Sequence, residues 1–493
     1  MENKMLTAMK NSSNFVRTEN GALTHKTTNS AVLDMFATGG AMRKRSDEDK
    51  ILMFKKAYDE NPTLALKCLF YLRDVRGGQG ERDFFKVCFS WFVENCQVSE
   101  RTIGKLIALI PFYGRWDDLY CLVGTKYENK MFGFMKQQLI LDSECKTPSL
   151  LAKWLKSENT SSEKSRFLAR KTRIAFGISS KQYRILLSEN RSKINIVEKL
   201  MSQGNWDKIE FDKIPSKAGF KYKNAFARND VTKARYQEFM KSKTTKVNAG
   251  TLYPYEIVNK ATHHIANATE RNAINKYWDN LTDYFKNKSL DAVAVIDTSA
   301  SMRGTPLDVA CALGIYMAER NKGPFYNHYI SFSRKASLME IEGIDFVDKV
   351  RCIYRKNLCE NTNIESVFDL IFGLVISKQI NPNDIPKNIF IISDMEFDAA
   401  RGCYSYSKEK DSVNTLMEKI KSRWNSYGLQ MPHLIFWNVD ARQNNIPMKD
   451  DGNVSYVSGF SPVLFETVMS GKTGYELMLE KLLSKRYSKI TLN

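Results

Sequence analysis

The sequence predicts two halves of different fold class, an α-helical first half and an α/β second half. Apolar residues recur at helical spacing from Asp47 to about Asn280, whereas short apolar runs alternate with helical segments after residue 291. A length of 493 residues is also sufficient for more than one domain. We therefore expect an N-terminal arm over residues 1–45, a helical domain over 46–285 and an α/β domain over 290–493.

In the helical half, apolar side chains fall at positions i, i+3, i+4 and i+7, which places them on one face of a helix. Two such sets are Phe85, Cys88, Phe89 and Phe92, and Ile103, Leu106, Ile107 and Ile110. Short polar breaks such as DENP (59–62) and GRWDD (114–118) separate successive segments, although the sequence has no repeat of fixed period. This pattern predicts amphipathic helices stacked as in a solenoid.

The second half alternates strand-like and helix-like segments. The apolar runs lie at 292–296, 326–332, 388–393 and 433–439, and the helical patterns between them cover 306–320, 363–379 and 411–427. Such alternation is typical of a mostly parallel sheet covered by helices. We expect a doubly wound α/β domain that binds ligands beyond the carboxyl ends of its strands.

The composition favours a globular, cytoplasmic protein with a polyanionic partner. Hydrophobic residues make up 43% of the chain and aromatic residues 12%, which excludes a disordered protein. No stretch approaches the roughly 18 apolar residues of a membrane span, and the first thirty residues lack the apolar core of a secretory signal, so we expect no membrane partner. The nine cysteines form no CxxC pair, so a zinc site is not expected. The net charge of +19 favours binding to nucleic acid.

A candidate metal site follows the first apolar run of the second half. In AVAVIDTSASMRG (292–304), Asp297, Ser299 and Ser301 come directly after the predicted strand. The alternation D-x-S-x-S can turn a carboxylate and two hydroxyls towards one point, and Mg²⁺ prefers such oxygen donors. Thr362, at the start of a predicted helix, and Asp394, at the end of another strand, add two donors. The alternative is that DTSAS caps the next helix, but capping does not predict the last two donors.

These five positions resemble the metal-ion-dependent adhesion site of von Willebrand factor A domains. The pattern of that site is DxSxS, then a loop threonine, then an aspartate after the fourth strand. The resemblance implies that Asp297, Ser299 and Ser301 ligate Mg²⁺ or another divalent cation, directly or through water, while Thr362 and Asp394 complete the shell. It also implies a coordination position that is open to the carboxylate of an acidic protein partner.

Two glycine-containing stretches resemble nucleotide-binding loops but lack the required spacing. RGGQGER (76–82) has no third glycine at the necessary position and follows a helical pattern. SGKTG (470–474) has Glu466 where the first glycine of a phosphate-binding loop belongs. We interpret the first as a helix–helix corner that uses the conformational freedom of glycine, and the second as a surface turn.

Four stretches of the first half carry a second resemblance. They are TENGALTHKTTNSAVLDMF (18–36), RDVRGGQGER (73–82), FYGRWDDL (112–119) and VEKLMSQGNWDKIEFDKIPSKA (197–218). In this order, and ahead of an A-like domain, they resemble the TROVE module of the Ro ribonucleoproteins, and more closely a TROVE-like branch found in plants, phages and large viruses. The resemblance covers nearly the whole chain. It implies a ring of HEAT-like helical repeats that is closed by the A domain and binds small non-coding RNAs and RNA ends.

The basic excess is concentrated in residues 151–250, where about 23 basic residues face about 9 acidic ones. Arg166, Arg170 and Arg173 share one predicted helix face, which can neutralise phosphates and stack on bases. The residues predicted to contact RNA are Arg166, Arg170, Lys171, Arg173, Lys181, Arg184, Arg191 and Lys193. The alternative is a merely solvated face. Possible stacking platforms are Tyr183, Trp206, Tyr222 and Tyr236, although aromatic residues at helical spacing usually belong to the core.

The leading functional hypothesis is a non-enzymatic protein that holds small non-coding or single-stranded RNA on its basic helices. No Ser/His/Asp or Cys/His nucleophile pattern occurs in the sequence, so we do not expect catalysis. The alternative is a protein-interaction module that captures an acidic partner residue through the metal site, without specific RNA binding. A metal-dependent nuclease is a third hypothesis, and it would need Glu396 and Asp398, beside Asp394, as further metal ligands.

Overall fold

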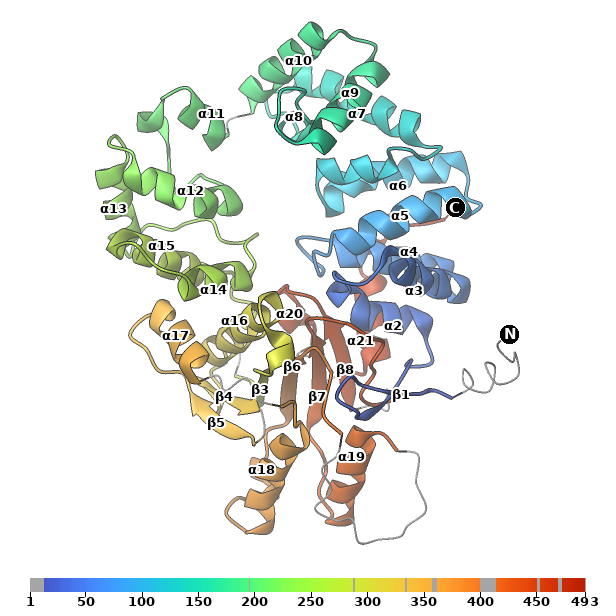
Figure 1. The fold of residues 1–493 in the computed structure, drawn as a ribbon, viewed down its shortest axis with the longest axis vertical. Helices are drawn as coiled ribbons and strands as arrows, with labels where there is room; N and C mark the ends of the chain where they lie inside the picture. Colours follow the sequence, from blue (N-terminus) through green and yellow to red (C-terminus); the bar gives the residue numbers. More distant parts are fainter. Residues whose placement is uncertain are drawn as a thin grey trace.

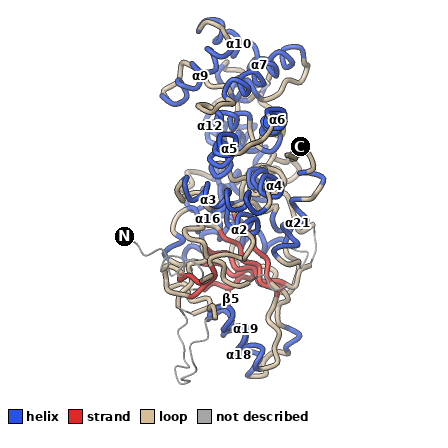
Figure 2. Tube along the Cα trace, turned by 90° about the vertical axis from the view of Figure 1, so that its right-hand side faces the viewer, coloured by secondary structure: helices blue, strands red, loops and turns tan. Residues whose placement is uncertain are grey.

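The helices of the first half leave one side of an α/β domain and return to its other side, so that the path of the chain closes a ring (Figure 1). This computed structural model describes residues 13–194, 196–286, 289–332, 335–356, 361–399, 414–449, 453–468 and 472–492. Figure 2 shows the same arrangement edge-on, with the helices of the first half stacked above the sheet. The predicted order of a helical region and an α/β region is confirmed.

The first arm of the ring, as we call residues 13–193, begins with an antiparallel hairpin of β1 (Phe15–Arg17) and β2 (Leu23–His25). Its helices are α2 (Ala31–Thr38), α3 (Asp47–Glu60), α4 (Pro62–Arg73), α5 (Asp83–Asn95), α6 (Glu100–Tyr113), α7 (Glu128–Glu144), α8 (Leu151–Trp154), α9 (Glu163–Phe176) and α10 (Ser180–Lys193). Both predicted apolar sets, on α5 and α6, are buried. Serine side chains accept the first backbone N–H groups of α3, α6, α9 and α10, which explains where these helices begin.

The second arm returns the chain to the α/β domain. Its helices are α11 (Val197–Ser202), α12 (Ser216–Arg228), α13 (Lys233–Lys241), α14 (Pro254–Thr262) and α15 (Ala268–Asp279). Helix α14 packs against α16 (Thr305–Arg320), where Asn259 donates a 2.8 Å hydrogen bond to Asp308. Trp278 of α15 stacks on Phe346 with ring centroids 3.9 Å apart. The second arm is therefore anchored by both polar and aromatic contacts.

The α/β domain contains a six-stranded sheet of order β5-β4-β3-β6-β7-β8. The strands are β3 (Ala292–Asp297), β4 (His328–Phe332), β5 (Ser337–Glu340), β6 (Asn388–Ser393), β7 (His433–Asn438) and β8 (Val454–Ser458). Only the edge strand β5 runs antiparallel to its neighbour, so the prediction of a mostly parallel sheet is confirmed.

Helices cover both faces of this sheet. Alternate side chains of β3 belong to two separate apolar clusters, because successive residues of a strand point to opposite faces. One cluster contains Ala292, Ala294 and Ile296 with α16, and the other contains Val293 and Val295 with α18 (Glu365–Ile376) and α19 (Leu416–Ser426). Figure 1 shows α18 and α19 on the side of the sheet that faces away from the ring.

Several elements of this domain did not follow from the apolar pattern. They are β5, β8, α17 (Phe346–Lys356), α20 (Leu464–Val468) and α21 (Gly474–Leu482). Strand β8 was missed because two of its five residues are serines, which are buried and hydrogen-bonded rather than apolar. The first three residues of the predicted helix 411–427 lie outside the described residues, as do Cys359 and Cys403.

The RGGQGER corner joins the first arm to the sheet. Gln79 donates to the Phe36 carbonyl at 3.2 Å, and Ser458 of β8 donates to the Gln79 side chain at 3.1 Å. Gly40 lies against this pair, since a Cβ there would come within 1.8 Å of the Gln79 side-chain oxygen. Gly80 adopts a φ of 69°, which favours glycine. The corner is thus a docking element between two parts of the fold.

In the second glycine stretch, SGKTG (470–474), Thr473 caps the N-terminus of α21. Ser470 and Gly471 of this stretch lie outside the described residues. No helix in the described part of the chain is both long and apolar enough to cross a membrane.

Candidate functional site

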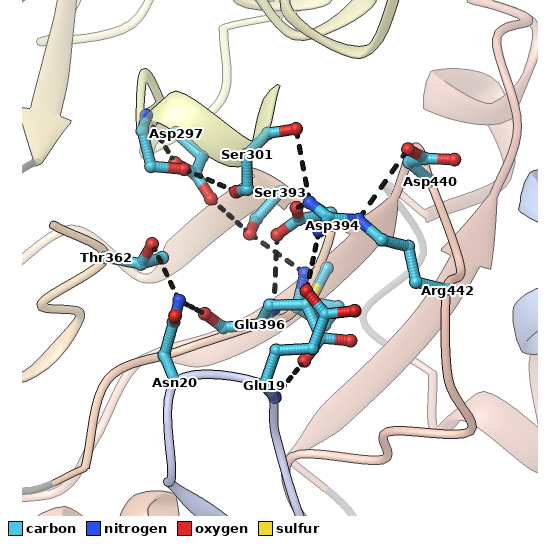
Figure 3. A network of polar contacts seen from close by, with 12 residues as sticks. Glu19, Asn20, Asp297, Ser301, Thr362, Ser393, Asp394, Glu396, Asp440 and Arg442 are labelled. Carbon is cyan, nitrogen blue, oxygen red and sulfur yellow. Dashed lines mark hydrogen bonds and ion pairs between the residues drawn. The ribbon is translucent and has the colours of Figure 1, made fainter. Parts of the chain in front are cut away.

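The five predicted oxygen donors lie at one edge of the sheet, and Figure 3 shows four of them, Asp297, Ser301, Thr362 and Asp394. Asp297 is the last residue of β3, and Asp394 directly follows β6, the parallel neighbour of β3. Ser299 and Ser301 follow β3 in the next turn, and their hydroxyl oxygens are 2.9 Å apart. Thr362 precedes α18, and its carbonyl accepts a hydrogen bond from the Asp398 N–H at 2.9 Å. All five side chains except that of Ser301 are buried.

The two aspartates of this edge interact with each other. Burial, together with the neighbouring carboxylate of Asp394, raises the pKa of Asp297 to about 7, against the opposing hydrogen bonds from Ser393 and Ser299. Ser393 donates to one Asp297 oxygen at 2.5 Å, and the Ser299 N–H donates to the other at 2.9 Å. The fold therefore holds two acidic groups close together away from solvent.

Arg442 is a residue of this edge that the sequence pattern did not reveal. Its guanidinium donates to the Asp394 carboxylate and, at 3.1 Å, to the Ser301 carbonyl. It also donates to the Glu19 carboxylate at 2.6 Å. Arg442 comes from the loop after β7, 48 residues beyond Asp394, and no local motif marks it. Only the alignment of neighbouring strand ends brings it here.

The turn of the N-terminal hairpin forms a second unexpected part of the site. Asn20 donates to the Glu396 carbonyl at 2.6 Å and to the Thr362 hydroxyl at 3.4 Å (Figure 3). The N–H of Glu19 donates to the Glu396 carboxylate at 2.7 Å, and Asn445 donates to the same carboxylate at 2.7 Å. The turn from β1 to β2 thus covers this edge of the sheet.

Negative charge exceeds positive charge among these groups. The carboxylates are those of Asp297, Asp394, Glu396 and Asp440, which are buried, and of Glu19, which is 41% exposed. Within the described residues, the cations that pair with them are Arg442 and Lys44. Burial, with the neighbouring charges of Asp394 and Glu19, raises the pKa of Glu396 to about 7, although its hydrogen bond from Glu19 opposes the shift. A buried excess of negative charge favours uptake of either protons or a cation.

The donor set suits a hard cation by its chemistry. Carboxylate and hydroxyl oxygens are the ligands that Mg²⁺ and Ca²⁺ prefer. In the described part of the chain, no three histidine, cysteine, aspartate or glutamate side chains are grouped to hold a metal. A cation at this edge would therefore depend on the hydroxyls of Ser299, Ser301 and Thr362 as well as on Asp297 and Asp394.

Most of the predicted RNA-contacting residues bind other parts of the protein. Arg166 donates to the carbonyls of residues 160 and 161 at 2.8 and 2.9 Å, and Arg173 pairs with Glu158 at 2.8 Å. Lys171 pairs with Glu128, and Arg191 donates to the carbonyls of residues 152 and 155. The predicted stripe of three arginines is therefore not one free face.

Four of the eight predicted residues are exposed, and three of them, Arg170 on α9 and Lys181 and Arg184 on α10, extend into solvent. Lys193 is also exposed, but it donates to the carbonyl of residue 143 at 2.9 Å. Among the four aromatic candidates, Tyr183 and Tyr236 are buried core residues, and Trp206 and Tyr222 are half-buried. The solvent-accessible cations of α9 and α10 are thus the ones available to an external anion.

A groove of about 580 Å³ lies between α10 and α11, beside these cations. Its lining residues include Arg184, Arg191 and Lys199 together with the acidic Glu158 and Glu198. The two acids are paired with Arg173 and Lys153, respectively. The hydroxyls of Ser157, Ser188, Ser192 and Ser202 complete much of the lining. Such a surface can donate hydrogen bonds to phosphate oxygens.

Two further motifs of the first half form a buried ion-pair network. Arg73 pairs with Asp118 through two bonds of 2.8 and 2.6 Å, and both side chains are almost wholly buried. Arg82 donates to Asp118 at 2.7 Å and to Asp117 at 2.5 Å. The charged residues of RDVRGGQGER and FYGRWDDL therefore hold α4, α5 and the turn after α6 together.

Comparison with known proteins gives matches over both halves. A family model described as a domain of unknown function (DUF2828) matches residues 18–99 and 114–290, more than half of the chain, and another such domain (DUF7788) matches residues 291–487. An uncharacterized protein of Acanthamoeba polyphaga mimivirus is 28% identical over 497 residues, which cover 92% of this chain and 84% of the relative. The crystal structure of the Ro (RSR) protein of Deinococcus radiodurans is similar with a TM-score of 0.46 and 11% identity, covering 92% of this chain and 99% of that chain.

Proposed function

This chain belongs to the DUF2828 family, and we propose that it is a non-enzymatic RNA-binding protein. In this proposal the helical ring holds small non-coding or single-stranded RNA, as the resemblance of its motifs to the TROVE module implies. The second half acts as a von Willebrand factor A-like domain that closes the ring and holds Mg²⁺ or another divalent cation. The observation that carries the RNA proposal is the set of exposed cations on α9 and α10.

Exposed cations favour an external anion because the fold has left them available. Arg170, Lys181 and Arg184 project from helices on which Arg166, Lys171, Arg173, Arg191 and Lys193 are bonded internally. Phosphate contacts supply the largest share of nonspecific affinity for nucleic acid, and arginine also stacks on unpaired bases. The groove beside Arg184 adds the hydroxyls of Ser157 and Ser188 as donors, whereas those of Ser192 and Ser202 donate to backbone carbonyls.

The proposed cation would be held by Asp297, Ser299, Ser301, Thr362 and Asp394. When bound, it would neutralise part of the buried negative charge at this edge. A nuclease has less support, because the Glu396 carboxylate accepts hydrogen bonds from the Glu19 N–H and from Asn445. Capture of an acidic protein partner also has less support, because the hairpin turn with Glu19 and Asn20 already covers the same edge.

The proposal is tested by purifying the full-length protein from its native cells and sequencing the RNA that accompanies it. The informative variant is Arg170→Gln/Lys181→Gln/Arg184→Gln, which leaves the internally bonded Arg166 and Arg173 intact. A charge-matched control is Lys378→Gln/Lys387→Gln/Lys419→Gln, which changes three exposed lysines of the α/β domain. We expect the wild type and the control to enrich the same small RNAs and the first variant to lose them.

Binding of the purified protein to a single-stranded RNA oligonucleotide gives a second measure. Each phosphate contact contributes a slope of about 0.7 to the fall of log affinity with log salt. Loss of the three cations should therefore reduce that slope by up to about 2. Equal enrichment and equal slopes for all three proteins would contradict the assignment of RNA to α9 and α10. Absence of any enriched RNA with the wild type would contradict the RNA-binding function itself.

A further inference from the structure

The turn between β1 and β2 is the only part of the described first arm whose side chains contact a proposed cation ligand. Asn20 reaches Thr362 directly, and Glu19 reaches Asp394 through the guanidinium of Arg442, which binds both carboxylates. Figure 3 shows Glu19 and Asn20 approaching the donors from the side opposite to Asp297 and Ser301. Two residues from the N-terminal region therefore extend a site that otherwise belongs to the α/β domain.

Backbone contacts fix the position of this turn. The Ala399 N–H donates to the Asn20 carbonyl at 3.1 Å, and Gly21 forms an antiparallel bridge with Asp398. The hydroxyl of Thr18 donates to the Phe397 carbonyl at 2.6 Å. These bonds pair the turn with the segment that follows Asp394. They therefore hold the turn next to the proposed ligands. Its placement does not depend on the Glu19 side chain alone.

Without a cation, the carboxylates of the hairpin turn and of the α/β domain repel each other. The Glu19 and Asp394 carboxylates share the guanidinium of Arg442, and this single positive charge compensates only part of their negative charge and that of the neighbouring Glu396. A divalent cation on the five donors would attract the carboxylates of both the hairpin turn and the α/β domain. Its binding would consequently stabilise the docked hairpin, and the docked hairpin would in turn strengthen cation binding.

We propose that Glu19 and Asn20 belong to the cation site and that the cation fastens the first arm of the ring to the α/β domain. This inference rests on the cation of the proposed function and adds its structural role. The acidic group next to the donors is then Glu19 of the chain itself, which is linked to Asp394 through Arg442. The cation acts as a clasp, by which we mean a link between the hairpin turn and the α/β domain where the ring closes, and does not bind another protein.

The first test is the affinity of the full-length protein for Mn²⁺ alone, measured by electron paramagnetic resonance of free Mn²⁺. Glu19→Gln keeps the size of the side chain and the backbone bonds of the turn but removes its negative charge. We expect this variant to bind Mn²⁺ at least about fivefold more weakly than the wild type, the lower range of coupling between linked sites. The control Glu340→Gln removes an exposed acid on β5 and should change the affinity less than about twofold.

The second test follows hydrogen exchange of the amides of residues 15–25 with and without Mn²⁺. We expect the cation to slow this exchange in the wild type and to slow it less in Glu19→Gln. Wild-type affinity in Glu19→Gln, with exchange slowed equally in both proteins, would overturn the role of Glu19 while leaving the cation site in place. Absence of saturable Mn²⁺ binding by the wild type would overturn both the clasp and the proposed cation site.

Discussion

The sheet edge and the helices α9 and α10 use charged residues in opposite ways. At the sheet edge, buried acids are bonded to Arg442, to serines and to the hairpin turn. On α9 and α10, Arg170, Lys181 and Arg184 extend into solvent. Residue type alone therefore does not separate structural charges from functional ones. Burial and the identity of the internal partner do so.

The largest expected effect comes from breaking a buried ion pair of the first arm. Arg73→Ala leaves Asp118 with a buried charge and removes two hydrogen bonds, which should cost about 3–5 kcal/mol of unfolding free energy. Urea unfolding followed by circular dichroism measures this loss. A change below about 1 kcal/mol would show that Arg82 and Lys86, which also contact Asp118, compensate for the missing partner.

Addition of a divalent cation should give the next largest effect. At a free Mg²⁺ concentration one hundred times its Kd, binding to the native state stabilises by about 2.7 kcal/mol. We expect a corresponding rise in the urea midpoint of the wild type and none in Asp297→Asn, which lacks a proposed ligand. The same rise in both proteins would place the bound cation elsewhere on the chain.

Close packing at the corner that joins the first arm to β8 gives a smaller effect. Gly40→Ala would force a Cβ into the Gln79 side chain and should destabilise the protein by about 1–3 kcal/mol. Gly373→Ala, in the middle of α18, is the matched control because its Cβ would enter open space. The control should be stabilised by roughly 0.5–1 kcal/mol, since alanine favours the helix. Thermal unfolding of the two variants in parallel measures both the expected destabilisation by Gly40→Ala and the expected stabilisation by Gly373→Ala.

The smallest stability change is expected on the exposed helices. Arg170→Gln should alter the unfolding free energy by no more than about 0.5 kcal/mol, because the wild-type side chain is exposed. Its affinity for single-stranded RNA should nevertheless fall and become less dependent on salt. Arg173→Gln provides the contrast, since loss of the bond to Glu158 should lower stability. If Arg170→Gln were the more destabilising of the two, Arg170 would have a structural role despite its exposure.

Hydrophobic periodicity was sufficient to predict a helical first half and a mostly parallel α/β second half. The sets on α5 and α6 are buried, and the strands β3, β4, β6 and β7 fall within one or two residues of their predicted bounds. These features are local, because a period of 3.6 or a run of apolar residues can be read from one stretch of chain. Strand β8 and the short edge strand β5 escaped prediction because neither has a continuous apolar run.

The candidate site followed from the sequence only in part. The five oxygen donors could be named because they directly follow strands or precede a helix whose pattern is local. Glu19, Asn20 and Arg442 could not be named, since they lie in segments far from the donors along the chain. Their approach depends on strand order and on the backbone pairing of the hairpin turn with residues 396–399.

The fold class of each half, the order of the five donors and the basic excess of residues 151–250 can all be read from the sequence. Which charged side chains are bonded within the protein and which remain exposed follows only from its tertiary contacts. Arg166 and Arg170 look equivalent on one helix face, yet one binds backbone carbonyls and the other faces solvent. The physical reason is that a charged side chain is satisfied by whatever the fold brings near it, and such neighbours are distant in sequence.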